Sequence, residues 1–309
     1  MPNSRAYAGL TAAVIIWGLN YPFVTLGLKF ASPIWLAFFR SLAGFLGAVA
    51  LLYAFKKHNE KLTTREKTYA ALLGIPGSVL FFGFWFLGST KVPPGVSSVL
   101  INSFPLWILF LSIPMLGDRP KFTKVGAAFL GFAGVFLVSQ IGFVKTSFDF
   151  FSVLELAIAG FCFGLLNVSM KRLYKGEKML QANAWQLGAS LIPLAAWAQL
   201  GTPVESVHWS LDLFAVIIWI GVLGTAIVFH LWFTLLSKYN AASLSSYFFM
   251  IVVVALISSY FIFGEKITPI QGVGVGAIII SVYFVNRNGE GSKNKEEKKE
   301  EKGIQSSSR

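Results

Sequence analysis

The sequence predicts an all-α membrane protein with ten transmembrane helices, arranged as two inverted five-helix repeats. Three observations predict this fold: the composition, an internal repeat, and the distribution of positive charge between the loops. The chain has 309 residues, of which 55% are hydrophobic and only 13% charged. Soluble domains carry about 25% charged residues. We therefore expect nearly all of the chain to lie in a membrane.

The internal repeat relates residues 70–139 to residues 217–286 at a constant offset of 147. The matching landmarks are Gly74 with Gly221, Gly77 with Gly224, Trp85 with Trp232, Lys91 with Lys238 and Ser98 with Ser245. A repeated unit with an odd number of spans must insert its two copies in opposite orientations. Inverted repeats of this kind are typical of secondary transporters.

Ten stretches are apolar and long enough to cross a bilayer. They cover residues 6–28, 33–55, 69–88, 95–116, 121–140, 150–172, 179–200, 211–236, 243–263 and 268–286. The connection at 201–210 is the boundary that the sequence marks least sharply. We expect a first five-helix unit over 6–142 and a second over 150–286. The Lys/Glu/Ser-rich residues 288–309 predict a disordered tail, because they have too few apolar side chains to form a core.

Positive charge is distributed unevenly between the two sets of loops. One set contains thirteen Lys and Arg residues and the alternate set four. The richer set begins with the loop from Lys56 to Lys67 and the poorer one with Lys29. Because positively charged loops stay in the cytoplasm, this predicts that both termini are cytoplasmic and that the protein lies in the plasma membrane. The tail 288–309 is then a cytoplasmic tail.

Several function classes are excluded by what the sequence lacks. The net charge of +12 arises mainly from short loops on one side of the membrane, so we expect no nucleic-acid partner. The single cysteine, Cys162, allows no internal disulfide, and no Cys/His spacing suggests zinc. There is no paired-carboxylate site, no Ser/His/Asp grouping and no Walker-type loop. We therefore predict no enzyme activity, no catalytic residues, no metal and no cofactor.

Short motifs occur in a characteristic order along the chain. Trp17 to Phe23 reads Trp-Gly-Leu-Asn-Tyr-Pro-Phe, Pro33 precedes Phe38-Phe39-Arg40, and Gly117-Asp118-Arg119 follows the fourth span. Gly264-Glu265-Lys266 repeats that ending in the second half. In order, spacing and duplication, these motifs resemble the EamA-type branch of the drug/metabolite transporter superfamily, over roughly residues 6–286.

The resemblance implies a central cavity between the two halves, alternating access, and export or exchange of small metabolites, often amino acids. Two departures from the family pattern are Asp118, where the family usually has Glu, and Gln186, which corresponds to Arg40 at an offset of 146. The small four-span exporters of the superfamily rely on an acid in their first helix. The first span here has none, which disfavours cation exchange of that type.

Polar groups inside a span are costly, so each is a candidate for function. Arg40 lies about two turns into the second span and could bind a carboxylate or phosphate, or could be structural. His230 could relay protons or could simply be a buried neutral residue. Asn20, Asn102 and Gln186 could bind a zwitterion or hold helices together.

Aromatic residues in the same spans complete the predicted substrate-binding set. Trp17, Tyr21 and Trp85 could line the cavity or could anchor the helices at the membrane interface. The predicted substrate-binding residues are therefore Trp17, Asn20, Tyr21, Arg40, Trp85, Asn102, Gln186 and His230.

We predict a secondary transporter that exports or exchanges small organic metabolites, with amino acids as the leading substrates. The expected partners are a small-molecule solute and membrane lipid, and the protein is expected to be a monomer or homodimer. One alternative is a phosphorylated-metabolite or nucleotide-sugar exchanger, which requires Lys171 and Arg172 to turn inward beside Arg40. Another is a membrane assembly protein or lipid scramblase without solute transport.

Overall fold

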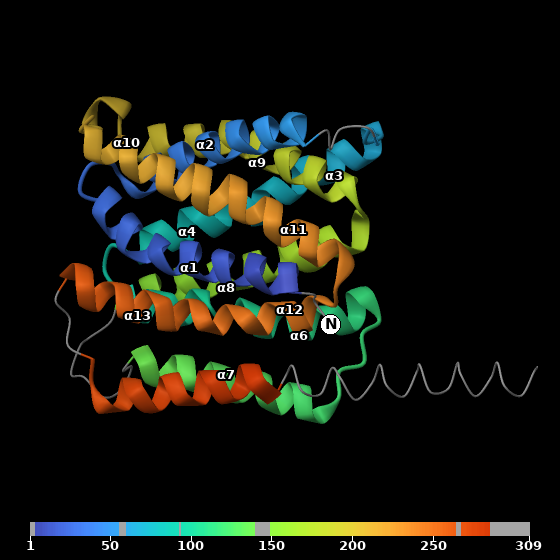
Figure 1. Cartoon of the computed structure of the whole chain (residues 1–309). Coiled ribbons are helices and arrows are strands. Elements are labelled where there is room, and N and C mark those ends of the chain that lie inside the picture. Colours follow the sequence, from blue (N-terminus) through green and yellow to red (C-terminus); the bar gives the residue numbers. More distant parts are fainter. Residues whose placement is uncertain (1–3, 56–59, 93, 140–148, 264–266, 285–309) are drawn as a thin grey trace, which may run out of the picture.

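The computed structural model describes residues 4–55, 60–92, 94–139, 149–263 and 267–284 (Figure 1). Within these ranges every regular element is helical, as the composition predicted. The predicted tail 288–309 and residues 140–142 of the first unit lie outside the described residues.

The first half of the chain supplies the following elements in order: α1 (Ser4–Gly27), α2 (Pro33–Ala54), α3 (Thr64–Gly74), the π-helix η1 (Ile75–Leu80), α4 (Phe81–Gly88), α5 (Pro94–Ile101), α6 (Phe104–Leu116) and α7 (Phe122–Ser139). The elements α3, η1 and α4 follow one another without a gap. They begin earlier than the predicted span 69–88 because Thr63 and Glu66 form a capping box. In it, the Thr63 hydroxyl accepts from the Glu66 backbone N–H, and the Glu66 carboxylate accepts from the Thr63 backbone N–H.

We expect the substitution Thr63→Ala to lower stability by about 1 kcal/mol, because it removes the side-chain acceptor of this cap. Thr64→Ala is the matched control, since Thr64 is the first helical residue and makes no cap contact through its side chain. The measurement is the thermal unfolding midpoint of the purified protein in one detergent. Equal midpoints for the two variants would contradict the assigned role of Thr63.

The second half of the chain supplies the remaining elements: α8 (Phe150–Leu173), α9 (Glu177–Gly201), η2 (Val204–Ser206), α10 (Leu211–Ile217), the π-helix η3 (Ile218–Ile227), α11 (Val228–Lys238), α12 (Ala241–Ser245), η4 (Ser246–Phe248), α13 (Phe249–Phe263) and a final helix Pro269–Phe284. The connection that the sequence left indistinct is now bounded, because α9 ends at Gly201 and α10 begins at Leu211.

The fourth apolar stretch is not the single helix that we expected. It is broken between α5 and α6, at Asn102 and Ser103. Pro105 lacks a backbone N–H and cannot continue the hydrogen-bond ladder. The side chains of Asn102 and Ser103 instead donate to the carbonyl oxygens of Ser98 and Leu100, at 2.7 and 2.6 Å. The break leaves the Asn102 side chain at a bend in the helical path.

Five helices are long and apolar enough to cross a membrane by length and composition: Ala6–Gly27, Pro33–Ala54, Thr64–Gly88, Phe150–Leu173 and Leu211–Lys238. Shorter apolar helices are Phe104–Leu116, Phe122–Val138, Ser246–Ile262 and Pro269–Phe284. The regular structure of the described residues is thus entirely helical, and several of its helices are apolar enough to cross a membrane.

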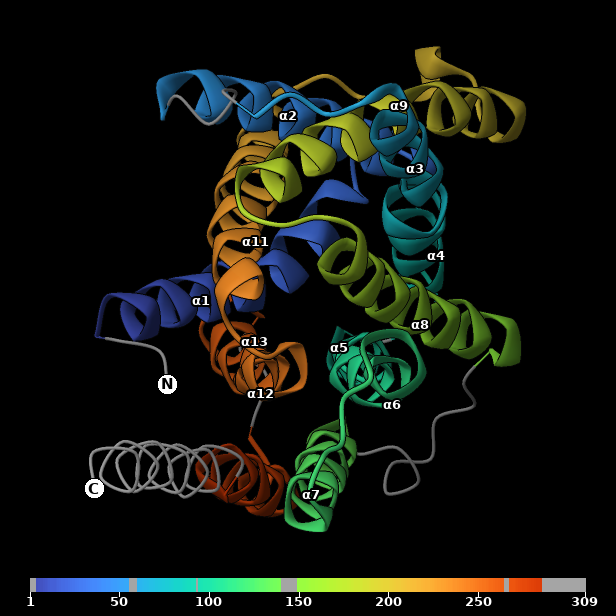
Figure 2. The ribbon, with the colours of Figure 1, turned by 90° about the vertical axis from the view of Figure 1, so that its right-hand side faces the viewer.

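The helices pack mainly across the two halves of the chain, and the packing pairs are related by the repeat. Helix α1 packs against α13, and α8 packs in the equivalent way against α6. Likewise α2 packs against η3, while α9 packs against α3 and η1. Figure 2 shows α2 and α9 together on one side of the bundle, with α7 and the final helix on the opposite side. Each half therefore completes the core of the other.

Candidate functional site

Arg40 lies on α2 at the contact with η3, and its guanidinium is almost wholly buried. Its Nε atom donates to the Thr225 hydroxyl at 3.0 Å, and that hydroxyl donates to the Ile220 carbonyl five residues earlier. The wide turns of η3 present Thr225 at this position, and π-helical turns are frequent at functional sites. The guanidinium carbon lies 4.3 Å from the Phe82 ring centre and 4.8 Å from the Trp85 ring centre. The cation is thus held over aromatic faces.

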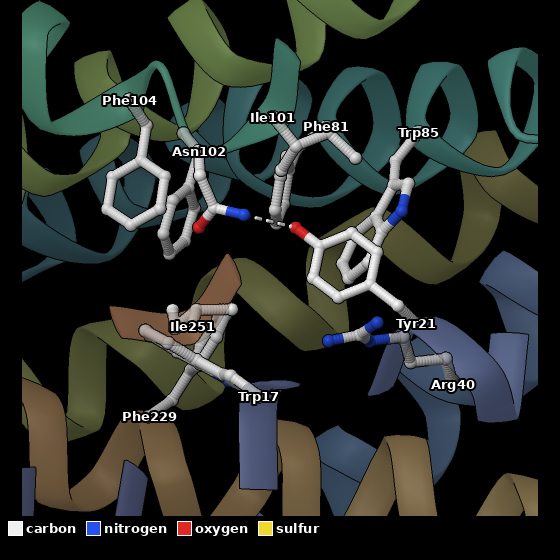
Figure 3. A pocket seen from close by; sticks show the side chains of 11 residues that line it. Trp17, Tyr21, Arg40, Phe81, Trp85, Ile101, Asn102, Phe104, Phe229 and Ile251 are labelled. Atoms are coloured by element: carbon white, nitrogen blue, oxygen red, sulfur yellow. Dashed lines mark hydrogen bonds between the residues drawn. The ribbon is translucent and has the colours of Figure 1, made fainter. Parts of the chain in front are cut away.

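A small cavity adjoins this guanidinium (Figure 3). Helix α1 contributes Trp17 and Tyr21, α4 contributes Trp85, and the break after α5 contributes Asn102. The full lining is Trp17, Tyr21, Arg40, Phe81, Trp85, Ile101, Asn102, Phe104, Phe163, Phe229 and Ile251. Both halves of the chain therefore meet around one cavity whose walls are mostly aromatic.

A hydrogen bond joins the two sides of the cavity. The Asn102 amide nitrogen donates to the Tyr21 hydroxyl oxygen at 2.7 Å, as Figure 3 shows. The Tyr21 ring lies 5.4 Å from the Trp85 ring. The Trp17 indole N–H donates to the Gly224 carbonyl at 2.8 Å, which ties α1 to η3. These contacts hold the cavity walls in defined orientations.

Several polar atoms around the cavity are buried without a hydrogen-bond partner among the described residues. They are Arg40 Nη1, Trp85 Nε1 and Asn102 Oδ1. Leaving such atoms unpaired costs about 1–3 kcal/mol each, and more for a charged group. Two of them are donors and one is an acceptor. The arrangement can bind a solute that brings both an anionic oxygen and a hydrogen-bond donor.

Arg40 is also the only charged side chain that is fully buried in the described part of the chain. The residues that line the cavity include no carboxylate. A buried charge without a counter-charge is strongly unfavourable. The site therefore favours a negatively charged ligand. In the described ranges no group of His, Cys, Asp and Glu side chains could hold a metal ion.

The structure brings together five of the eight predicted site residues: Trp17, Tyr21, Arg40, Trp85 and Asn102. The other three lie outside the cavity lining. Asn20 is fully buried, and its amide packs against Gly224. Gln186 accepts from the Ser78 hydroxyl and donates to Asn183. His230 is partly exposed, with its ring 5.5 Å from that of Phe55 at the end of α2.

Sequence reasoning did not identify six apolar lining residues: Phe81, Ile101, Phe104, Phe163, Phe229 and Ile251. Apolar side chains inside a span carry no polar signal of function. The repeat does contain a signal, however, because Phe104 and Ile251 are separated by the offset of 147 and both line the cavity. When one residue lines the cavity, the residue that the repeat relates to it is therefore a candidate lining residue as well.

The alternative of a phosphorylated-metabolite exchanger requires further cations in the cavity. Lys171 instead donates to the carbonyl oxygens of Leu236 and Tyr239, at 2.6 and 2.7 Å, at the end of α11. Arg172 is exposed at the end of α8. Arg40 is the one cation among the residues that line the cavity, so this geometry disfavours the alternative.

The cavity volume is only about 30 Å³, roughly the volume of one water molecule. Pockets that bind organic ligands measure about 300–1,000 Å³. The described conformation is therefore too closed to hold a metabolite. A metabolite at this place would need the residues around the cavity to move apart.

The sequence matches the EamA-like transporter family over residues 4–140 and again over 150–287. An "Uncharacterized transporter" of Archaeoglobus fulgidus is 26% identical over 279 residues, which cover 90% of this chain and 97% of that protein. The "Uncharacterized transporter YvbV" of Bacillus subtilis is 26% identical, with 95% of each chain covered. The "Uncharacterized inner membrane transporter YedA" of Escherichia coli is 23% identical over 90% of each chain.

A crystal structure of similar fold superposes with a TM-score of 0.73 at 17% identity, covering 93% of this chain and 99% of that chain. At this identity the similarity concerns the fold alone. The family matches cover both halves of the chain, and the relatives are transporters rather than enzymes. The chain therefore belongs to the EamA-like transporter family.

Proposed function

We propose that this protein is a secondary transporter that exports or exchanges small organic metabolites, amino acids foremost, across the plasma membrane. The observation that carries the proposal is the buried, uncompensated Arg40 beside unpaired polar atoms of Trp85 and Asn102. Arg40 Nη1 and the Trp85 indole N–H are suited to the carboxylate of an amino acid. The Asn102 amide oxygen is suited to its ammonium group, and the aromatic walls to an apolar side chain.

The proposed mechanism is alternating access between two inverted five-helix units, 6–142 and 150–286, that together provide ten spans. The internal repeat supports this mechanism, and so does the packing of helices from one half against helices of the other. Because the repeat relates these helix contacts in pairs, the two halves can adopt each other's conformation. The unequal loop charges support an orientation with both termini in the cytoplasm. The small cavity volume fits an occluded stage of such a cycle. As a monomer or homodimer, the protein would need no other chain to form the site.

We expect overexpression in a bacterial host to lower the intracellular pool of at least one amino acid and to raise resistance to its toxic analogue. The measurement is metabolite profiling of cells and medium, with an equally expressed Arg40→Met variant as the inactive control. Release of a phosphorylated metabolite instead would favour the alternative substrate class. Unchanged pools and unchanged resistance across all twenty amino acids would refute the amino-acid assignment.

A further inference from the structure

The two halves differ in one hydrogen bond that the repeat predicts for both. Asn20 and Asn167 are separated by the repeat offset, and so are Trp85 and Trp232. In the second half the Trp232 indole N–H donates to the Asn167 amide oxygen, and both side chains are fully buried. In the first half Trp85 Nε1 and both amide atoms of Asn20 are buried without a partner in the described part of the chain. The pair Asn167 and Trp232 is thus hydrogen-bonded, and we call it the closed pair. The pair Asn20 and Trp85 is not, and we call it the open pair.

Further contacts close the end of the bundle that contains Trp232. Lys171 donates to two carbonyl oxygens at the end of α11, and the Asn240 amide donates to the Asp118 carboxylate at 3.1 Å. These bonds connect α8 to the end of α11, and the segment after α11 to the turn after α6. At the repeat position of Lys171 the first half has Val24, which cannot donate. The first half therefore lacks the equivalent of the Lys171 contact, although Lys91 pairs with Asp149 at 3.7 Å at the end of the bundle where Trp85 lies.

The cavity contacts the first-half Asn–Trp pair through Trp85 alone. Trp85 and Tyr21 line it, whereas Trp232 and Asn167 do not. The pair without a hydrogen bond therefore meets the cavity through Trp85, and the hydrogen-bonded pair does not meet it. In an inverted-repeat transporter the two halves exchange conformations when the site changes sides. A hydrogen bond that is formed in one half in one state is then expected at the equivalent position of the other half in the opposite state.

We propose that Asn20 and Trp85 form the equivalent hydrogen bond in the oppositely facing state, in which the bond between Asn167 and Trp232 is broken. The two pairs are then positioning residues of the transport cycle, each closing one half of the path. This inference rests on the alternating access of the proposed function. It explains why the Asn20 amide oxygen is buried without a donor, since the Trp85 indole N–H donates to that oxygen in the other state.

The test compares Trp232→Phe with Trp85→Phe in the full chain, because Phe keeps a ring and removes only the indole donor. We expect Trp232→Phe to shift the ratio of the two states about fivefold toward the opposite state, the effect of one hydrogen bond. Hydrogen–deuterium exchange in lipid nanodiscs then rises in α11 and falls in α4. We expect Trp85→Phe to act in the opposite direction, and the double variant to return both helices toward the wild-type exchange.

Asn167→Leu and Asn20→Leu provide a second, independent pair of variants. Asn167→Leu should shift the exchange in the same direction as Trp232→Phe, and Asn20→Leu in the same direction as Trp85→Phe. If Trp85→Phe fails to reverse the shift of Trp232→Phe, or if both raise exchange in the same helix, the proposal is wrong. The Tyr21 ring beside Trp85 would then be sufficient to explain the open pair, since Val168 occupies the equivalent position. These shifts are measured without solute. Opposite shifts in a protein that transports no solute would therefore overturn the proposed function alone.

Discussion

Replacing Arg40 by methionine is expected to reduce transport about 10- to 100-fold while leaving the fold intact or more stable. The loss follows from the removal of the charged donor that faces the cavity, because hydrogen bonds to charged groups contribute about 1.5–3 kcal/mol. The unchanged or raised stability follows from the removal of a buried cation without a counter-charge. Thr225 keeps its bond to the Ile220 carbonyl at 2.8 Å, so the variant leaves no unpaired hydroxyl.

The measurement is solute uptake into proteoliposomes together with the thermal unfolding midpoint. Gln186→Met is the matched control, because Gln186 bonds to Ser78 as Arg40 bonds to Thr225, the residue 147 positions after Ser78. Gln186 also bonds to Asn183, and both of its contacts lie away from the cavity. It should lower the midpoint and change transport less. Arg40→Lys should recover only part of the activity, since an ammonium group lacks the planar donor fork. Transport by Arg40→Met at the wild-type rate would contradict a role for Arg40 in substrate binding.

Replacing Gly274 by alanine is expected to destabilise the packing of the final helix against α7 by about 1–3 kcal/mol, as overpacking does. The new Cβ would lie 2.6 Å from the Gly134 carbonyl oxygen and 2.9 Å from the Val138 nitrogen. Both are backbone atoms, so a helix must move rather than a side chain. The Gln271 amide, which donates to the Val138 carbonyl at 3.2 Å, would be displaced with it.

Gly276→Ala is the matched control for this helix pair. Its Cβ would meet no atom within 4 Å, and replacing a glycine inside a helix gains about 0.5–1 kcal/mol. The two variants, only two residues apart, should therefore move the thermal unfolding midpoint in opposite directions. Two midpoints that move together would show that helix propensity, and not close backbone approach, governs this helix pair.

Most of the fold could be predicted, because membrane helices are marked by long apolar runs and by the residues that end them. The predicted stretch 150–172 corresponds closely to α8, and 211–236 to the continuous run from α10 to α11. The break at Asn102 was not located, because Pro105 could either kink this span or be accommodated within it. Hydropathy does not register the loss of one backbone donor. The helix can continue if neighbouring side chains replace the lost backbone hydrogen bond, and otherwise it bends. Which of these happens depends on where those side chains lie in the folded protein.

The candidate site was predicted in part. Arg40 and Asn102 were identifiable because a polar side chain in a span is costly wherever it lies. Gln186 met the same criterion, yet it bonds to Ser78 in a packed interface. The residue type at one position does not show whether a polar side chain faces a cavity or bonds to a neighbouring helix. That difference depends on which residues of distant helices face it.

By itself, the sequence determined that this is a helical membrane protein built from two related halves, because hydrophobicity and repetition are properties of the chain alone. Only the tertiary structure decided that Trp17, Tyr21, Arg40, Trp85 and Asn102 share one cavity. It also decided that Asn167 has a partner while Asn20 has none among the described residues. The physical reason is that the repeat makes the two halves equivalent in sequence. A single folded conformation places them in different environments, and the difference exists only in the packing.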